Sequence, residues 1–121
     1  MSKTHKIGAS HSEGEEVIFH LRSISVAEEN RYTNRYAEIS DMDSDERKAE
    51  KEYEILTDVL AEWSTDAPTI KVKGVEQPST AETPAAGVRE FFAERSNEKE
   101  RTAQQVVVQF RRKLQPRVVF Y

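Results

Sequence analysis

One amphipathic stripe in the middle of the chain constrains the fold more than any other feature. Five of its apolar residues recur at intervals of three and four: Ala49, Tyr53, Leu56, Leu60 and Trp63. This spacing places them on one face of an α-helix, and Ile55 and Val59 widen that face. The stripe therefore predicts a helix of about twenty residues with one continuous buried face.

The chain has few other apolar residues to cover that face. The chain has 121 residues, 33% of them charged, and only 26 are Val, Ile, Leu or Phe. This fraction is close to the level at which chains stay disordered, so we expect one small domain. The chain has no cysteine, which excludes disulfides, cysteine-ligated metals and thiol nucleophiles.

The N-terminal part of the sequence predicts a leader, a strand and a helix. Residues 1–14 contain a single large aliphatic side chain and predict a flexible leader. Apolar and polar residues alternate over 15–22, as in a half-buried strand. Ser25 and Glu28 have the spacing of a capping box and predict a helix from there to about Ile39.

The C-terminal half predicts a short strand and two further helices. Pro68 predicts the end of the central helix, and residues 69–73 alternate like a strand. The predicted fold is α+β and mainly helical: a small helical domain with one or two short strands and a C-terminal helical arm. The expected divisions are a leader (1–14), an α+β body (15–76), a loop (77–86) and a C-terminal helical arm with an apolar tail (87–121).

The string most similar to a metal motif runs from Asp41 through Asp43 and Asp45 to Glu52. These residues match positions 1, 3, 5 and 12 of an EF-hand loop. The loop requires glycine at position 6, where this chain has Glu46. The string therefore predicts an acidic start to the central helix, with Asp43 and Glu46 at capping-box spacing.

Other catalytic patterns are missing from the sequence. His5 and His11 fall in the predicted leader, and His20 stands alone on the polar side of a predicted strand. The four glycines are scattered and form no phosphate-binding loop. We therefore predict a protein that is not an enzyme, with no catalytic, cofactor or metal site. No apolar run is long enough to span a bilayer, so we also expect no membrane partner.

Charge is distributed unevenly along the chain. Between Asp41 and Asp66 there are ten acidic and three basic residues, whereas the last twenty residues carry only positive charges: Arg111, Arg112, Lys113 and Arg117. We order three interpretations: cations that stabilise a helix C-terminus, then pairing between copies of the chain, then nucleic-acid contact. The formal net charge of −4 argues against nucleic acid.

The predicted arm is rich in aromatic and aliphatic residues. Because the small body offers little surface to cover them, we predict that they bind a protein partner and that the chain forms homo-oligomers. The predicted partner-binding residues are Phe91, Phe92, Phe110, Arg111, Arg112, Leu114, Phe120 and Tyr121.

The layout resembles that of tail assembly chaperones of long-tailed bacteriophages. The resemblance covers about Glu16 to Pro68: a strand with Phe19-His20-Leu21-Arg22-Ser23-Ile24-Ser25, a helix with Glu28-Glu29-Asn30-Arg31-Tyr32 and a helix that closes in Leu60-Ala61-Glu62-Trp63. It extends more loosely through Leu114 and carries no diagnostic motif. Some members of the family have a frameshifted extension, and nothing in this chain shows one.

The resemblance implies a small α-rich protein that binds the tape-measure protein or tail-tube subunits in the host cytoplasm and performs no chemistry. Such a chaperone masks a client's apolar surface until assembly and is missing from the finished tail. Two alternatives remain open from the sequence. One is a structural neck or tail-terminator subunit, and the other is a small nucleic-acid-binding regulator that uses the basic C-terminus.

Overall fold

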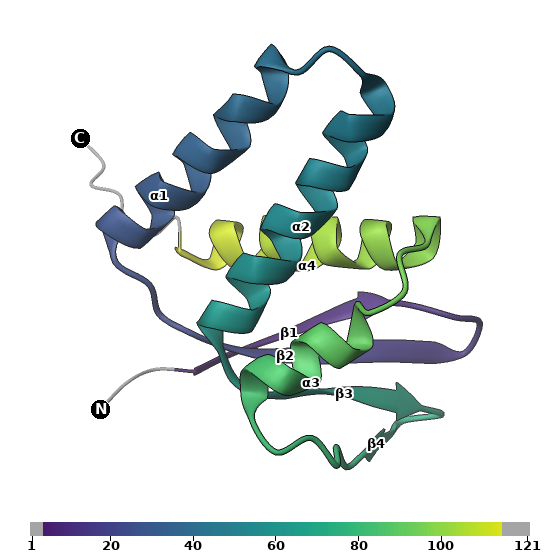
Figure 1. Ribbon diagram of the computed structural model, residues 1–121. Helices are drawn as coiled ribbons and strands as arrows, with labels where there is room; N and C mark the ends of the chain where they lie inside the picture. The colour runs from purple at the N-terminus through teal and green to yellow at the C-terminus, as the bar shows by residue number, and fades with distance from the viewer. Residues whose placement is uncertain (1–3, 115–121) are drawn as a thin grey trace.

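The computed structural model describes residues 4–114 of the chain. Its strands form one antiparallel sheet in the order β1-β2-β3-β4, and its helices lie against one face of that sheet (Figure 1). The strands are β1 (Thr4–Ser10), β2 (Glu15–Arg22), β3 (Ser64–Val72) and β4 (Val75–Gln77). The helices are α1 (Val26–Ala37), the 3-10 helix η1 (Glu38–Asp41), α2 (Asp45–Trp63), α3 (Pro84–Phe91) and α4 (Asn97–Leu114).

This architecture corrects the predicted fold class. The fold is α+β, but the expectation of a small helical domain with only one or two strands is wrong, because four strands form the sheet. Consecutive strands pair with each other, and the hairpin of α1 and α2 is inserted between β2 and β3. The opposite face of the sheet carries mainly polar side chains, as antiparallel sheets allow.

The flexible leader predicted for residues 1–14 is also wrong over its described part, residues 4–14. Strand β1 pairs with β2 along its whole length, from Thr4 opposite Arg22 to Ser10 opposite Glu16. Three alternate side chains of β1 are buried: His5, Ile7 and Ala9. The alternation was not evident in the sequence because histidine and alanine are weak hydrophobic signals. Burial depends on which side chain faces α4, and that is a tertiary property.

Helix α2 supplies the centre of the core, as its apolar stripe predicted. Tyr53, Leu56, Leu60 and Trp63 are buried, and Ala49 at the open end of the stripe is half-buried. The indole of Trp63 contacts the rings of Tyr32 and Phe110 at centroid distances of 5.8 and 5.6 Å. One helix thus joins α1 on one side to α4 on the other.

The end of α2 differs from the prediction based on Pro68. The helix stops at Trp63 and β3 begins at the next residue, so Pro68 lies within the strand. The pairing of β2 with β3 shifts register between Ile18 and His20. Proline is tolerated at such an irregularity because it has no N–H to give to a regular ladder.

The helix starts follow capping chemistry. The Glu28 N–H donates to the Ser25 hydroxyl (3.1 Å), and the Ser25 N–H donates to the Glu28 carboxylate (3.0 Å), which confirms the predicted capping box. Helix α2 is capped by Ser44, which accepts from the Arg47 N–H, and not by Asp43 as predicted. Serine and aspartate are both favoured at this position, and the cap is the residue directly before the first helical residue.

The described part of the predicted C-terminal arm, residues 87–114, is part of the body. Helix α4 packs against β1 and α2, and its buried residues belong to the same core cluster as those of the sheet (Figure 1). The helix itself is confirmed, as are the cations Arg111, Arg112 and Lys113 in its last turn. Among residues 4–114, no helix is long and apolar enough to cross a membrane.

The ion pair at the start of α1 makes stability pH-dependent. Arg22 donates two hydrogen bonds to the Glu28 carboxylate (2.6 and 3.2 Å), and these, with the capping bond from Ser25, lower the pKa of Glu28 to about 2. Because the folded pKa lies below the unfolded value of about 4.3, the stabilisation is present above that value. It is lost as the pH falls toward 2.

We therefore expect Glu28→Gln to lower the free energy of unfolding at pH 7 by roughly 1–2 kcal/mol. Urea unfolding from pH 7 to pH 2 should show this difference shrinking below about pH 4.5. The matched control is Glu46→Gln, in the exposed first turn of α2, which should change stability much less. A difference between wild type and Glu28→Gln that persists unchanged at pH 2 would contradict this assignment.

Candidate functional site

A groove opens on the helix-covered side of the sheet, where the helix layer stops short. Strands β1 and β2 lie beneath α4 and α2, whereas β3 is covered by α3, which has only eight residues. The surface between α3 and β4 forms an open groove of about 470 Å³, within the usual range for ligand-binding sites. We call it the β4 groove; it is lined by Glu15, Pro68, Ile70, Val72, Gln77, Pro78, Ser79, Thr80, Gly87, Glu90 and Phe91.

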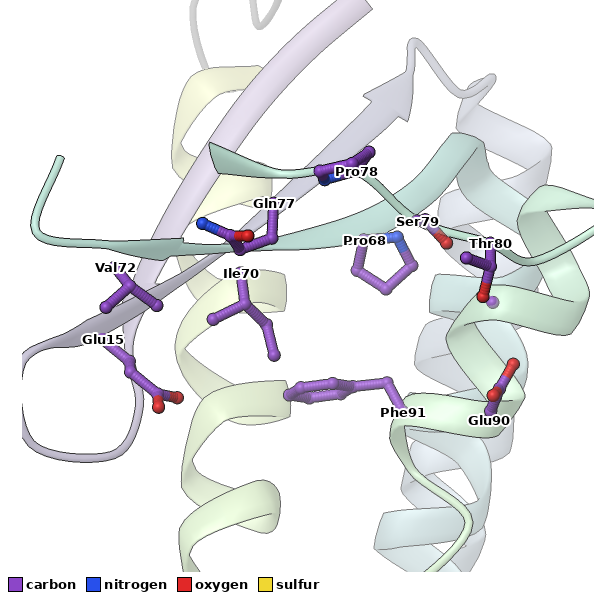
Figure 2. Close-up of a pocket in the computed structure, with 11 residues that line it drawn as sticks. Glu15, Pro68, Ile70, Val72, Gln77, Pro78, Ser79, Thr80, Glu90 and Phe91 are labelled. Atoms are coloured by element: carbon purple, nitrogen blue, oxygen red, sulfur yellow. The ribbon is translucent and has the colours of Figure 1, made fainter. Parts of the chain in front are cut away.

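The floor of the β4 groove is apolar. Pro68, Ile70 and Val72 come from β3, and the ring of Phe91 lies opposite them on α3 (Figure 2). Ile70 pairs with the buried Val17 of β2 and shares its face of the sheet. The three β3 side chains are only half-buried. The floor therefore continues the core surface to a place where no helix covers it fully.

Polar groups stand around this floor. The carboxylates of Glu15 and Glu90 lie at opposite ends of the groove, and Ser79 and Thr80 follow β4 along one side (Figure 2). An apolar surface with a few polar groups at its rim is typical of a binding site. Two carboxylates at its ends favour a ligand that carries positive charge.

Strand β4 forms the open edge of the sheet beside the groove. Lys73 and Gly74 have φ angles of 50° and 84° and form a two-residue turn, flanked by the pair Val72 and Val75. In such hairpins the pair beside the turn exchanges hydrogen bonds and the next pair does not. The backbone N–H and C=O of Glu76 therefore point out of the sheet. An edge of this kind can accept another strand.

The side chain of Val75 adds an apolar contact at this edge. It lies opposite Val72 and so on the groove side of the sheet, and it is 61% exposed. Glu76 points to the other face, where its carboxylate pairs with the ammonium of Lys6 at 3.1 Å. The edge thus presents an aliphatic side chain on the groove side and an ion pair on the other.

The two adjacent phenylalanines differ in burial, although their rings contact each other edge to face at a centroid distance of 4.8 Å. Phe92 is 3% exposed and contacts Phe19 and Tyr53 at ring centroid distances of 5.9 Å. Phe91 is half-buried: its ring lies 6.0 Å from Phe19, and the ammonium of Lys99 lies 4.5 Å from its centroid. These contacts fix the Phe91 ring in position beside the groove.

Phe91 is the only predicted partner-binding residue that the described part of the chain places at the β4 groove. Phe92, Phe110 and Leu114 are in the core. The expectation that the body leaves these three uncovered is therefore wrong, because the sheet has a helix-binding face that the sequence did not reveal. Phe120 and Tyr121 lie outside the described residues.

The predicted basic residues of α4 lie away from the groove. The guanidinium of Arg111 is 3.8 Å from the carboxylate of Glu29 and 5.5 Å from the centroid of the Tyr32 ring. Arg112 is exposed. Because α4 runs beside β1 and β4 is at the opposite edge of the sheet, these cations belong to a different surface.

The other polar cluster joins the β1–β2 turn to α4. His11 Nδ1 lies 3.4 Å from the Thr102 hydroxyl and 3.5 Å from the Glu98 carboxylate, and the Ser12 hydroxyl donates to Glu98 at 3.1 Å. These contacts attach the turn to the first turns of the helix, which is a structural role. Among residues 4–114, no group of three or more His, Cys, Asp or Glu side chains could hold a metal ion.

Comparisons with known proteins add no relative. No protein-family model, no curated protein and no solved structure matches this chain. The β4 groove is therefore the feature that bears on function.

Sequence reasoning missed the β4 groove because its residues come from separate segments. The sequence pattern places Glu15 and Ile70 in separate strands and Pro78 to Thr80 in a loop. The one available signal is the Phe91-Phe92 pair, since two adjacent residues of a helix cannot both be buried equally well against one flat surface. Only the pairing of β3 with β4 and the position of α3 bring these residues together.

The packing of α3 on β3 depends on Gly87. A Cβ at this position would overlap the side chain of Ala67 and lie 3.1 Å from its Cα and 3.2 Å from the Cβ of Ala81. Glycine inside a helix ordinarily costs about 0.5–1 kcal/mol relative to alanine. Here it permits the close approach that forms one wall of the β4 groove.

We expect Gly87→Ala to lower the free energy of unfolding by about 1–3 kcal/mol through overpacking, despite the better helix propensity of alanine. Urea unfolding would measure the change. Ala86→Gly, at the exposed neighbouring position, is the control and measures the propensity effect alone. A Gly87→Ala variant as stable as wild type, or more stable, would show that α3 has room to move away from β3.

Proposed function

We propose that this protein is a binding module that holds an extended, basic and apolar segment of a partner protein in the β4 groove. One observation carries the proposal: an apolar groove lies directly beside a strand edge whose Glu76 backbone groups point outward. Recognition by strand addition needs both features, since the strand edge pairs with the backbone of the partner segment and the groove receives its side chains.

The chemistry of the groove indicates which segment fits. An extended chain points alternate side chains to opposite faces. If it pairs with Glu76, every second residue faces the groove and contacts Ile70 or Phe91. Positively charged residues nearby would meet the carboxylates of Glu15 and Glu90. A basic segment rich in Val, Ile or aromatic residues satisfies these conditions and favours the extended conformation.

We propose a biological setting of tail assembly in a long-tailed phage, with the tape-measure protein or a tail-tube subunit as the client. The support is the resemblance of the Glu16–Pro68 layout to tail assembly chaperones, together with a groove that would cover an apolar segment before assembly. The client contact moves from the C-terminal helix, where Phe110 and Leu114 are buried, to the β4 groove around Phe91.

Synthetic peptides test the binding function directly. We would titrate ¹⁵N-labelled protein with capped peptides in which Val alternates with Lys, with Glu or with Ser, and with a Lys–Val peptide interrupted by Pro. The Lys–Val peptide should shift amide signals of β3, β4 and α3, and the Glu–Val peptide should bind at least about tenfold more weakly. The Pro-containing peptide should also bind weakly because proline cannot donate at a strand edge.

A groove variant and a matched control locate the binding. Val75→Lys/Glu90→Lys changes one exposed residue of the β4 edge and one exposed residue of the groove and should abolish Lys–Val peptide binding. Val108→Lys/Glu50→Lys makes the same changes at exposed positions on α4 and α2 and should bind as wild type does. The proposal fails if no peptide binds, or if both variants lose binding equally.

A further inference from the structure

The chain contains one segment with the composition that the β4 groove selects. Residues 117–121 read Arg-Val-Val-Phe-Tyr: one cation followed by four residues that favour extended structure. We infer that, in the absence of a client, the β4 groove binds residues 117–121 of a second copy of this chain. This inference rests on the proposed function, because it names an occupant for the same groove.

Alternate side chains of the bound segment would face opposite sides of the sheet. In an extended conformation Val118 and Phe120 point to one side and Val119 and Tyr121 to the other. One pair would enter the β4 groove beside Ile70 and Phe91, while the backbone pairs with Glu76. Arg117 supplies the positive charge that the carboxylates of Glu15 and Glu90 favour.

Helix α4 carries the chain away from its own β4 groove. Helix α4 reaches the groove wall at Lys99, whose ammonium contacts the ring of Phe91 and also donates to the Phe91 carbonyl. The fifteen residues from Lys99 to Leu114 carry the chain about 22 Å away along the helix. Six further residues to Phe120 span at most about 21 Å when fully extended.

The helix direction sets where α4 ends. Gln109 donates to the Gly8 carbonyl and Thr102 to the Ser10 carbonyl, so α4 runs antiparallel to β1 and ends at the opposite end of the sheet from the turn between β1 and β2 (Figure 1). The end of α4 therefore lies beside β1, at the opposite edge of the sheet from β4, and we assign the occupant of the groove to a second copy.

The contact joins two different surfaces of the chain, so it is heterologous. Each copy then has one donor segment and one acceptor groove, which generates rings or open chains. A client segment of the same chemistry would compete with the neighbouring copy for the β4 groove. Client binding and self-association would therefore oppose each other.

A mixing experiment with the full chain tests this arrangement. The groove variant is Val75→Lys/Glu90→Lys, and the donor variant is Val118→Asp/Phe120→Asp. Sedimentation velocity up to about 1 mM, a range that detects weak contacts, should show association of the wild type and monomers for each variant alone. An equimolar mixture should form dimers and nothing larger, because it contains one intact groove and one intact donor segment. The control variant Val108→Lys/Glu50→Lys should associate as the wild type does.

The outcomes separate this inference from the proposed function. Circular dichroism of each variant would confirm that it is folded. A wild type that stays monomeric, or a donor variant that associates as strongly as wild type, overturns the inference. If the Lys–Val peptide still binds the groove in that case, the proposed function stands. Loss of peptide binding as well would overturn both, whereas mixture-specific dimers that dissociate on addition of the Lys–Val peptide would support both.

Discussion

The packing of α2 on the sheet is the contact on which the rest of the structure depends. Trp63 closes the apolar face of α2 and contacts Tyr32 of α1 and Phe110 of α4. Nearer the N-terminus of α2, the hydroxyl of Tyr53 donates to the Phe92 carbonyl at 2.9 Å and anchors the end of α3. Every other helix therefore takes its position from α2, because a chain with so few large apolar residues has no second centre.

A helix layer organised around α2 cannot cover a four-stranded sheet evenly. Helices pack about 8–10 Å apart, so α2 and α4 fill the space above β1 and β2. Over β3 only α3 remains, drawn close to the strand at Gly87 and followed directly by the turn into α4. The β4 groove is thus a consequence of the small core, and the polar loop after β4 leaves it open to the solvent.

The sequence predicts the local features of the fold but not its long-range ones. The α2 stripe, the alternation of β2 and the Ser25–Glu28 capping box depend on residues close in the chain, and all three are confirmed. Strand β1 was missed because its buried His5 and Ala9 are apolar only in context. The predicted arm is wrong for the same reason. Strand β1 covers the face of α4 that carries Phe110, and the sequence does not predict β1. The groove residues were missed because strand pairing alone brings them together.

The position of the groove at a sheet edge also explains how the chain can avoid uncontrolled pairing. An open edge of aliphatic side chains promotes aggregation, and proteins limit this by keeping edge strands short or charged. Strand β4 is three residues long, Glu76 pairs with Lys6 across the outer face, and Lys73 lies in the adjoining turn. Only Val75 and the apolar floor remain to attract a strand. The edge is thus protected against long flat partners and stays accessible to a short segment, which is the selectivity that the proposed binding function requires.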